Sequence, residues 1–226
     1  MPEDNKLLVD APLIADPDAE EELGPSDAKA IADEDLQGSR LLLALKSVQS
    51  IDIDGEPGGL VELSCTFQPN YGTRFSWARL ILRLTSPENA TFIDIAPKEI
   101  KDSQPVKISV GSKGTLGLKY APAEGGVEQS KNAEFEVYQC TVQGSGVTTA
   151  KARWDFRESD HKQNGLGTSQ VLAFTLPVTG EVSGLVLVSA RLAKQGVGGA
   201  VASIKDMILG PGQTDYAFTF EIPKES

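Results

Sequence analysis

The stretch LVELSCTFQ, residues 60–68, decides the fold class of this chain. Its apolar residues Val61, Leu63, Cys65 and Phe67 alternate with polar ones, which is the period of two that places alternate side chains on one face of a β-strand. The stretch therefore predicts a strand that packs one side on a core and leaves the other side to solvent.

The same short alternation, bounded by Gly, Pro, Asn and Asp, recurs along most of the sequence. Further strands are predicted at residues 43–53, 76–85, 91–95, 106–110, 115–120, 134–143, 150–157, 170–176, 183–192 and 216–222. Because most of these runs have no helical pattern between them, a βαβ architecture is excluded. The sequence predicts an all-β antiparallel β-sandwich of about 10–11 strands, either immunoglobulin-like or jelly-roll-like.

The pattern also predicts which side chains face the core. Alternate residues from Tyr216 to Ile222 are expected to share the inner face, and Trp154 and Phe156 to point inward with Asp155 outward. The same reasoning predicts that three residues of the strand 134–143 point inward: Tyr138, Cys140 and Val142.

One segment departs from the strand pattern. Val201, Ile204 and Ile208 have helix-like spacing, and the run Gly-Pro-Gly at 210–212 would end a helix. A short helix is therefore predicted near residues 200–209, capping one end of the sandwich.

The charge of the chain is concentrated at its start. Residues 1–36 hold twelve of the 32 acidic residues against two lysines, whereas residues 37–226 hold 20 acidic and 19 basic residues. With no aromatic residue, such a composition buries too little surface to offset chain entropy. We expect a largely disordered acidic leader over 1–36 and a β-sandwich domain over 37–226. The alternative is that an apolar patch in the leader docks on another surface; its residues are Leu7, Leu8, Val9, Leu13 and Ile14.

Composition argues against several partners and locations. The body has no run of lysine and arginine, and phosphate binding needs a basic stripe, so no nucleic-acid partner is expected. No apolar run approaches the roughly 20 residues of a membrane-spanning helix, so no transmembrane segment is expected. The first residues lack the apolar core of a secretory signal, which makes a cytoplasmic location the expectation.

Two cysteines, Cys65 and Cys140, lie inside predicted strands and are expected to be reduced. The alternative is a disulfide between the sheets, since Trp77 between them imitates the Cys, Trp, Cys order of immunoglobulin domains. A cytoplasmic chain argues against that pairing.

Few residues offer catalytic chemistry. His161 is the single histidine and stands in a polar run typical of an exposed loop, which argues against histidine-based nucleophilic catalysis and against zinc. A metal-independent enzyme would rely on the carboxylates of Asp155, Glu158 and Asp160, a group that can in principle serve acid–base hydrolysis.

Two ligand-binding alternatives remain open. Asp52, Asp54 and Glu56 place carboxylates at every second position before a glycine turn, which resembles the opening of a calcium loop but lacks its later ligands. Trp77 and Trp154 are candidates for stacking on a sugar. Glycine pairs elsewhere lack the residues of a phosphate-binding loop, so no cofactor is expected.

The sequence thus favours a non-enzymatic β-sandwich module that binds another protein or self-assembles into a homo-oligomer. In this hypothesis the acidic leader acts as a docking or regulatory arm. A calcium- or carbohydrate-binding sandwich and a small enzyme are the alternatives.

Overall fold

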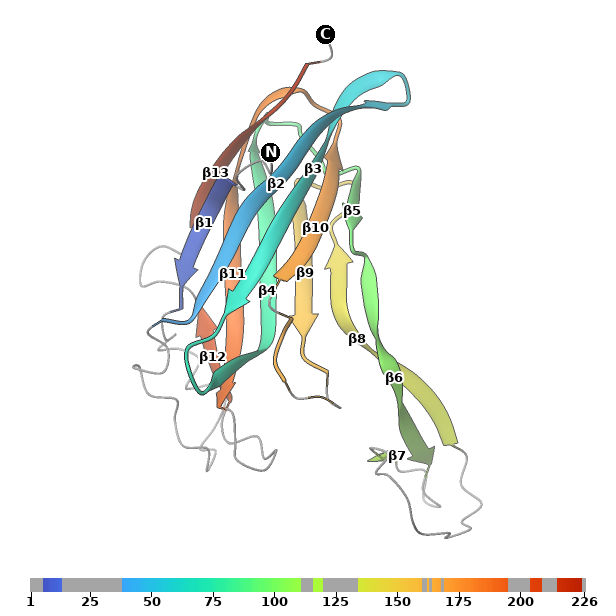
Figure 1. Ribbon diagram of the computed structural model, residues 1–226. Helices are drawn as coiled ribbons and strands as arrows, with labels where there is room; N and C mark the ends of the chain where they lie inside the picture. The colour runs from blue at the N-terminus through green and yellow to red at the C-terminus, as the bar shows by residue number, and fades with distance from the viewer. Residues whose placement is uncertain are drawn as a thin grey trace.

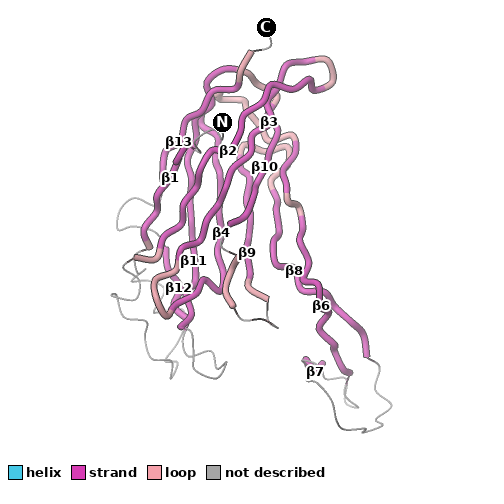
Figure 2. Tube along the Cα trace, viewed as in Figure 1, coloured by secondary structure: helices cyan, strands magenta, loops and turns pink. Residues whose placement is uncertain are grey.

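A computed structural model describes residues 6–13, 38–110, 116–119, 134–159, 162, 164–167, 169–194, 204–208 and 215–224. Described residues form thirteen strands and no helix (Figure 2). The strands are β1 (Lys6–Pro12), β2 (Arg40–Ile53), β3 (Glu56–Gln68), β4 (Thr73–Ser86), β5 (Asp94–Ala96), β6 (Glu99–Val110), β7 (Leu116–Lys119), β8 (Glu134–Ser145), β9 (Lys151–Arg157), β10 (Ser169–Leu176), β11 (Gly180–Lys194), β12 (Ile204–Ile208) and β13 (Asp215–Ile222).

The strands form two antiparallel sheets that pack face to face (Figure 1). The first, which we call sheet A, has the order β1-β2-β3-β10-β5. Sheet B has the order β12-β11-β4-β9-β8-β6-β7, and β13 also pairs with β11. The predicted all-β sandwich is therefore confirmed.

The core lies between the two sheets, and aromatic rings join them. Phe67 of sheet A contacts Phe156 of sheet B with ring centroids 5.1 Å apart. Phe174 of sheet A similarly faces Phe220 of β13 at 6.2 Å. Such tilted and edge-on contacts add to the free energy of burying the rings. The core thus depends on residues from both sheets.

Each of the eleven predicted strands corresponds to a strand of the structure, with ends shifted by a few residues. The alternation of residues 60–68 is confirmed, since every second side chain from Val61 to Phe67 is at most 2% exposed. Trp154 and Phe156 are also buried. The prediction for Tyr138 is wrong: its side chain is 49% exposed. It lies in the part of β8 that extends beyond the neighbouring strand β9, where there is no core to enter.

The expected acidic leader needs correction over its first described part. Residues Lys6–Pro12 form β1, which pairs with β2, and Val9 and Ala11 are buried. The docking alternative for this apolar patch holds for Val9 and Leu13, which join the core. The burial of Val9, Ala11 and Leu13, together with a strand ladder, outweighs the acidic composition around them. Residues 14–37 lie outside the described part of the chain.

The predicted helix near residues 200–209 is also wrong where it can be compared. Ile204–Ile208 form strand β12, which pairs with β11. A segment of five residues gains little from helical hydrogen bonds, whereas an open strand edge offers a complete ladder. The rest of the predicted helix lies outside the described residues.

Candidate functional site at the root of the β6–β8 arm

The strand pair β6 and β8 extends past the end of the sandwich (Figure 1). β8 pairs with β9 only over Val142–Ser145, at its end nearest the sandwich. Over residues 134–141 the described chain offers β8 no strand other than β6. We call the outer half of this pair, with β7 at its far end, the arm.

The register of the arm aligns residues of the same kind. Val106 pairs with Val137 and Ile108 with Phe135, while the polar residue Lys107 between them pairs with Glu136. Paired residues of an antiparallel ladder lie on one face, and neighbouring residues alternate between faces. Register and sequence together therefore assign the apolar residues to one face of the arm and the polar residues to the other.

A cavity of about 460 Å³ lies where the arm leaves the sandwich. Asp102, on the irregular stretch of β6, lines it and is only 7% exposed. Its carboxylate accepts a hydrogen bond from the Ser159 hydroxyl and a long one, 3.5 Å, from that of Ser103. Since Ser159 follows β9, this bond joins the arm to the sandwich body.

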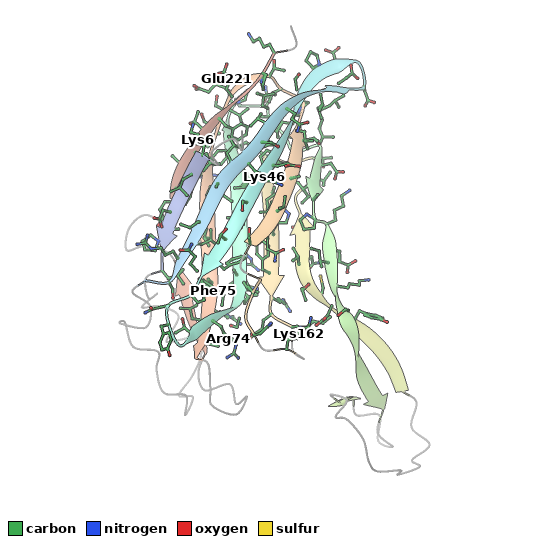
Figure 3. All side chains as sticks on the ribbon, in the orientation of Figure 1. Lys6, Lys46, Arg74, Phe75, Lys162 and Glu221 are labelled. Carbon is green, nitrogen blue, oxygen red and sulfur yellow. The ribbon has the colours of Figure 1, made fainter. Side chains whose placement is uncertain are left out.

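A second carboxylate fixes the loop on the other side of this cavity. Glu158 Oε2 lies 2.9 Å from Arg74 Nε and accepts a 3.0 Å hydrogen bond from the Gly165 amide. The Arg74 and Glu158 side chains are only 6% and 13% exposed, so water screens their attraction weakly. Lys162 lines the cavity together with Glu158. Figure 3 shows Lys162 and Arg74 at the same end of the sandwich.

A second cavity, of about 480 Å³, lies beside Trp77 on the outer face of sheet B. The Arg79 and Arg191 guanidinium carbons lie 5.1 Å and 5.4 Å from the centre of the Trp77 ring. Arg157 and Glu158 line this cavity as well as the first. Because Trp77 faces outward, it does not occupy the core position of the immunoglobulin tryptophan.

The two described carboxylates of the enzyme alternative, Asp155 and Glu158, do not line one cavity together. Glu158 lines both cavities, and Asp155 lines neither. Asp155 instead receives Arg79 Nε at 2.7 Å on one oxygen and Arg153 Nε at 2.6 Å on the other. Asp160 and His161 lie outside the described residues.

Sequence reasoning missed the buried acid of the first cavity. Asp102 stands in a polar run ahead of Pro105, where no alternation marks it as buried. Asp102 also lies outside the strand predicted at 106–110, and its burial depends on a hydrogen bond from the Ser159 hydroxyl. That donor is 57 residues away in the sequence.

The calcium candidates lie at the tip of the hairpin that joins β2 to β3. Asp54 and Gly55 form its turn with φ of 56° and 90°, values typical of a two-residue hairpin. Asp52 Oδ1 accepts a 3.0 Å hydrogen bond from the Gly55 amide, and Glu56 begins β3. Within the described ranges, no group of three or more acidic, histidine or cysteine side chains is placed to hold a metal ion.

Both cysteines are free thiols, as predicted. Cys65 is fully buried, and desolvation raises the pKa of its thiol far above the ordinary value. Cys140 is half-buried, and its thiol lies 2.9 Å from the Val142 carbonyl oxygen. Trp154, the second sugar-stacking candidate, is fully buried and offers no surface to a ligand.

Comparisons with known proteins add little. No protein-family model and no curated protein matches this sequence. Solved structures similar to the chain include Clostridium perfringens delta-toxin, with 10% identity, a TM-score of 0.32 and coverage of 80% of this chain and 83% of the toxin. A pore-forming protein has 12% identity, a TM-score of 0.36 and coverage of 87% and 89%. The Clostridium perfringens NetB toxin in its membrane-inserted form has 12% identity, a TM-score of 0.29 and coverage of 80% and 88%.

These TM-scores are too low to carry a functional argument. The described part of the chain, for its own part, holds no helix with the length and apolar character of a membrane span. The site must be interpreted from its own residues.

Proposed function

We propose that this protein is a non-enzymatic self-assembly module whose copies associate through the β6–β8 arm. The observation that carries this proposal is the register of the arm, which gathers apolar residues on one face of a ribbon outside the sandwich. At its far end the arm is a small sheet of three short strands in the order β7-β6-β8, and a further strand or a packed surface stabilises so small a sheet. A second arm supplies both.

The strand edge of β8 supports the same proposal. Over residues 134–141 its outer side pairs with no described strand. An open edge is a template for pairing with another chain, and natural proteins usually shorten, charge or cover such edges. This one is long, so it suits a specific partner strand.

The root of the arm is built to hold a fixed direction. Asp102 is bonded to Ser159, and Glu158 is bonded to Arg74 and to the amide of Gly165. A preset direction lowers the entropy lost when two arms meet. The buried carboxylates at the root are therefore interpreted as positioning residues for assembly.

The test is the size of the full-length protein by sedimentation velocity over a wide range of concentration. We expect oligomers, and we expect Ile108→Asp to shift the distribution towards monomer because it places a charge on the apolar face. Ser109→Asp is the matched control, since the neighbouring position belongs to the opposite face. The control should retain the oligomers of the wild-type protein.

A strict monomer at every concentration would overturn the proposal. Equal loss of oligomers in both variants would also contradict it, because a general effect of charge would then explain the result. Circular dichroism on each variant checks that the sandwich is intact.

A further inference from the structure

The outer face of sheet B gathers basic residues that are scattered in the sequence. Register places Trp77 between Arg191 and Arg157, and Arg79 beside Asp155. Over the outer positions 77–83 of β4, 151–157 of β9 and 185–191 of β11, the single acid is Asp155. Six basic residues occupy the same positions: Arg79, Arg83, Lys151, Arg153, Arg157 and Arg191. We call this surface the arginine face.

The arginine face corrects an expectation drawn from the sequence. No basic cluster was expected in the body, because it has no run of lysine and arginine and its 19 basic residues balance its 20 acidic ones. Antiparallel pairing brings positions more than 100 residues apart onto one surface, as with Trp77 and Arg191. The net charge of the body therefore conceals an uneven distribution.

The guanidinium groups on this face are held in place. Arg79 and Arg153 share the single carboxylate of Asp155, so these three side chains together retain a positive charge. Arg79 and Arg191 also lie over the Trp77 ring. A planar guanidinium fixed against a ring is preorganised to bind a carboxylate through paired hydrogen bonds.

We propose that the arginine face is the docking site of an acidic polypeptide segment, and that its occupant is the acidic segment 14–37 of the same chain. That segment holds nine acidic residues and one lysine. Arg157 and Arg191 are exposed and line the cavity of about 480 Å³ on this face. The acidic segment and the arginine face therefore carry charges of opposite sign. This inference does not depend on assembly through the arm.

The attachment points of the segment suit this occupant. Leu13 follows β1 and Ser39 precedes β2, and a 2.9 Å backbone hydrogen bond joins them. Figure 1 shows that β1 ends and β2 begins at the end of the sandwich where β4 begins and β9 and β11 end. Strand β1 contacts β13, which pairs with β11 of the arginine face.

The length of the segment is sufficient to reach the face. Sheets lie about 10 Å apart and strands about 4.8 Å apart. Half of the 24 residues in 14–37 spans about 40 Å when extended, which allows the chain to pass around the edge and return. Because the segment belongs to the same chain, its effective concentration at the face is in the millimolar range, so even weak contacts suffice for docking.

The first experiment measures acrylamide quenching of tryptophan fluorescence in the full-length protein. Trp154 is buried, so the quenching reports on Trp77. We expect stronger quenching in a full-length variant whose nine acids of the segment are replaced by Asn and Gln. High salt should raise quenching of the wild-type protein to the level of this neutral-segment variant, because salt screens the pairing of exposed charges.

The second experiment adds a labelled synthetic peptide of residues 14–37 to the neutral-segment variant and follows fluorescence anisotropy. Saturable binding is expected, weakened about tenfold by Arg157→Gln combined with Arg191→Gln. The matched control is Arg40→Gln with Lys46→Gln, which removes the same charge from sheet A and should leave binding unchanged.

Equal quenching of the wild-type and neutral-segment proteins would overturn the proposal. So would a peptide that fails to bind, or one that binds equally well to both double variants. A nucleic-acid oligomer of equal charge that binds far more tightly than the peptide would assign the face to another polyanion. The quenching comparison stands even if the double variant of the arginine face does not fold.

Discussion

The two outer faces of the sandwich share one strand geometry and differ in chemistry. The face of sheet A carries small, apolar and hydroxyl residues, among them Ser64, which is bonded to Ser169, and the half-exposed Val171. Its charges include Lys46, labelled in Figure 3, which forms an ion pair with Glu62. On sheet B, the arginine face carries six basic residues around one acid. Folding requires only that each strand bury one side, so the chemistry of the other side is left for function.

The largest difference in stability is expected between two tryptophans, one in the core and one on the outer face. Trp154 and Trp77 lie on neighbouring strands of sheet B, one fully buried and one facing outward. Trp154→Ala should lower the free energy of unfolding by about 3–5 kcal/mol, because it leaves a cavity between the sheets. Trp77→Ala should cost less than about 1 kcal/mol. Urea unfolding followed by circular dichroism measures both.

Similar losses for the two tryptophan variants would contradict this contrast. The Trp77 position on the outer face of sheet B would then contribute to the stability of the sandwich as much as the core position of Trp154 does.

A smaller effect is expected from the acid of each face. Asp155→Asn removes the carboxylate that Arg79 and Arg153 share, and should cost about 2 kcal/mol because two guanidinium groups lose a charged acceptor. Glu62→Gln on sheet A should cost below about 1 kcal/mol, since its partner Lys46 is 3.5 Å away and exposed. Thermal unfolding of both variants tests the difference, and equal shifts in Tm would count against an organising role for Asp155.

The smallest effect concerns pH at the edge of sheet A. The Lys98 side-chain hydrogen bond, followed by that of the Ile95 amide, holds the pKa of Asp94 below its ordinary value of 3.8. The resulting stabilisation is present above pH 3.8 and is lost as the pH falls through the lowered pKa. Lys98→Gln should therefore lose slightly less stability than the wild-type protein on acidification below pH 3.8.

The measurement is Tm against pH for both proteins. The difference is expected to be small because the Asp94 side chain is 54% exposed and solvent screens the pair. A steeper acid loss in Lys98→Gln than in the wild-type protein would reverse the sign and contradict the assignment.

Much of the fold could be predicted from local sequence. Alternating apolar residues such as Val61 and Phe67 arise wherever a strand has one buried face. This pattern therefore predicted the strands of the sandwich and several of their buried faces. Strands β1 and β12 were not predicted, because each forms by pairing with the open edge of a strand elsewhere in the chain. The burial of Tyr138 was predicted wrongly because β8 continues beyond the core.

The candidate site was much less predictable. Asp155 was correctly placed on the outer side of β9, but its partner Arg79 is 76 residues away. The buried bond between Asp102 and Ser159 spans 57 residues. No local pattern encodes such pairs, because side chains meet only through the order and register of strands.

The sequence by itself determined that this chain is an all-β sandwich with an excess of acid at its start. Hydrophobic periodicity and composition act locally, so both can be read along the chain. The tertiary structure alone decided that β6 and β8 continue beyond the core as an amphipathic arm. It also decided that Trp77 lies among arginines from three strands. Those features depend on which strands are neighbours, and that choice is made by the packing of the whole sandwich.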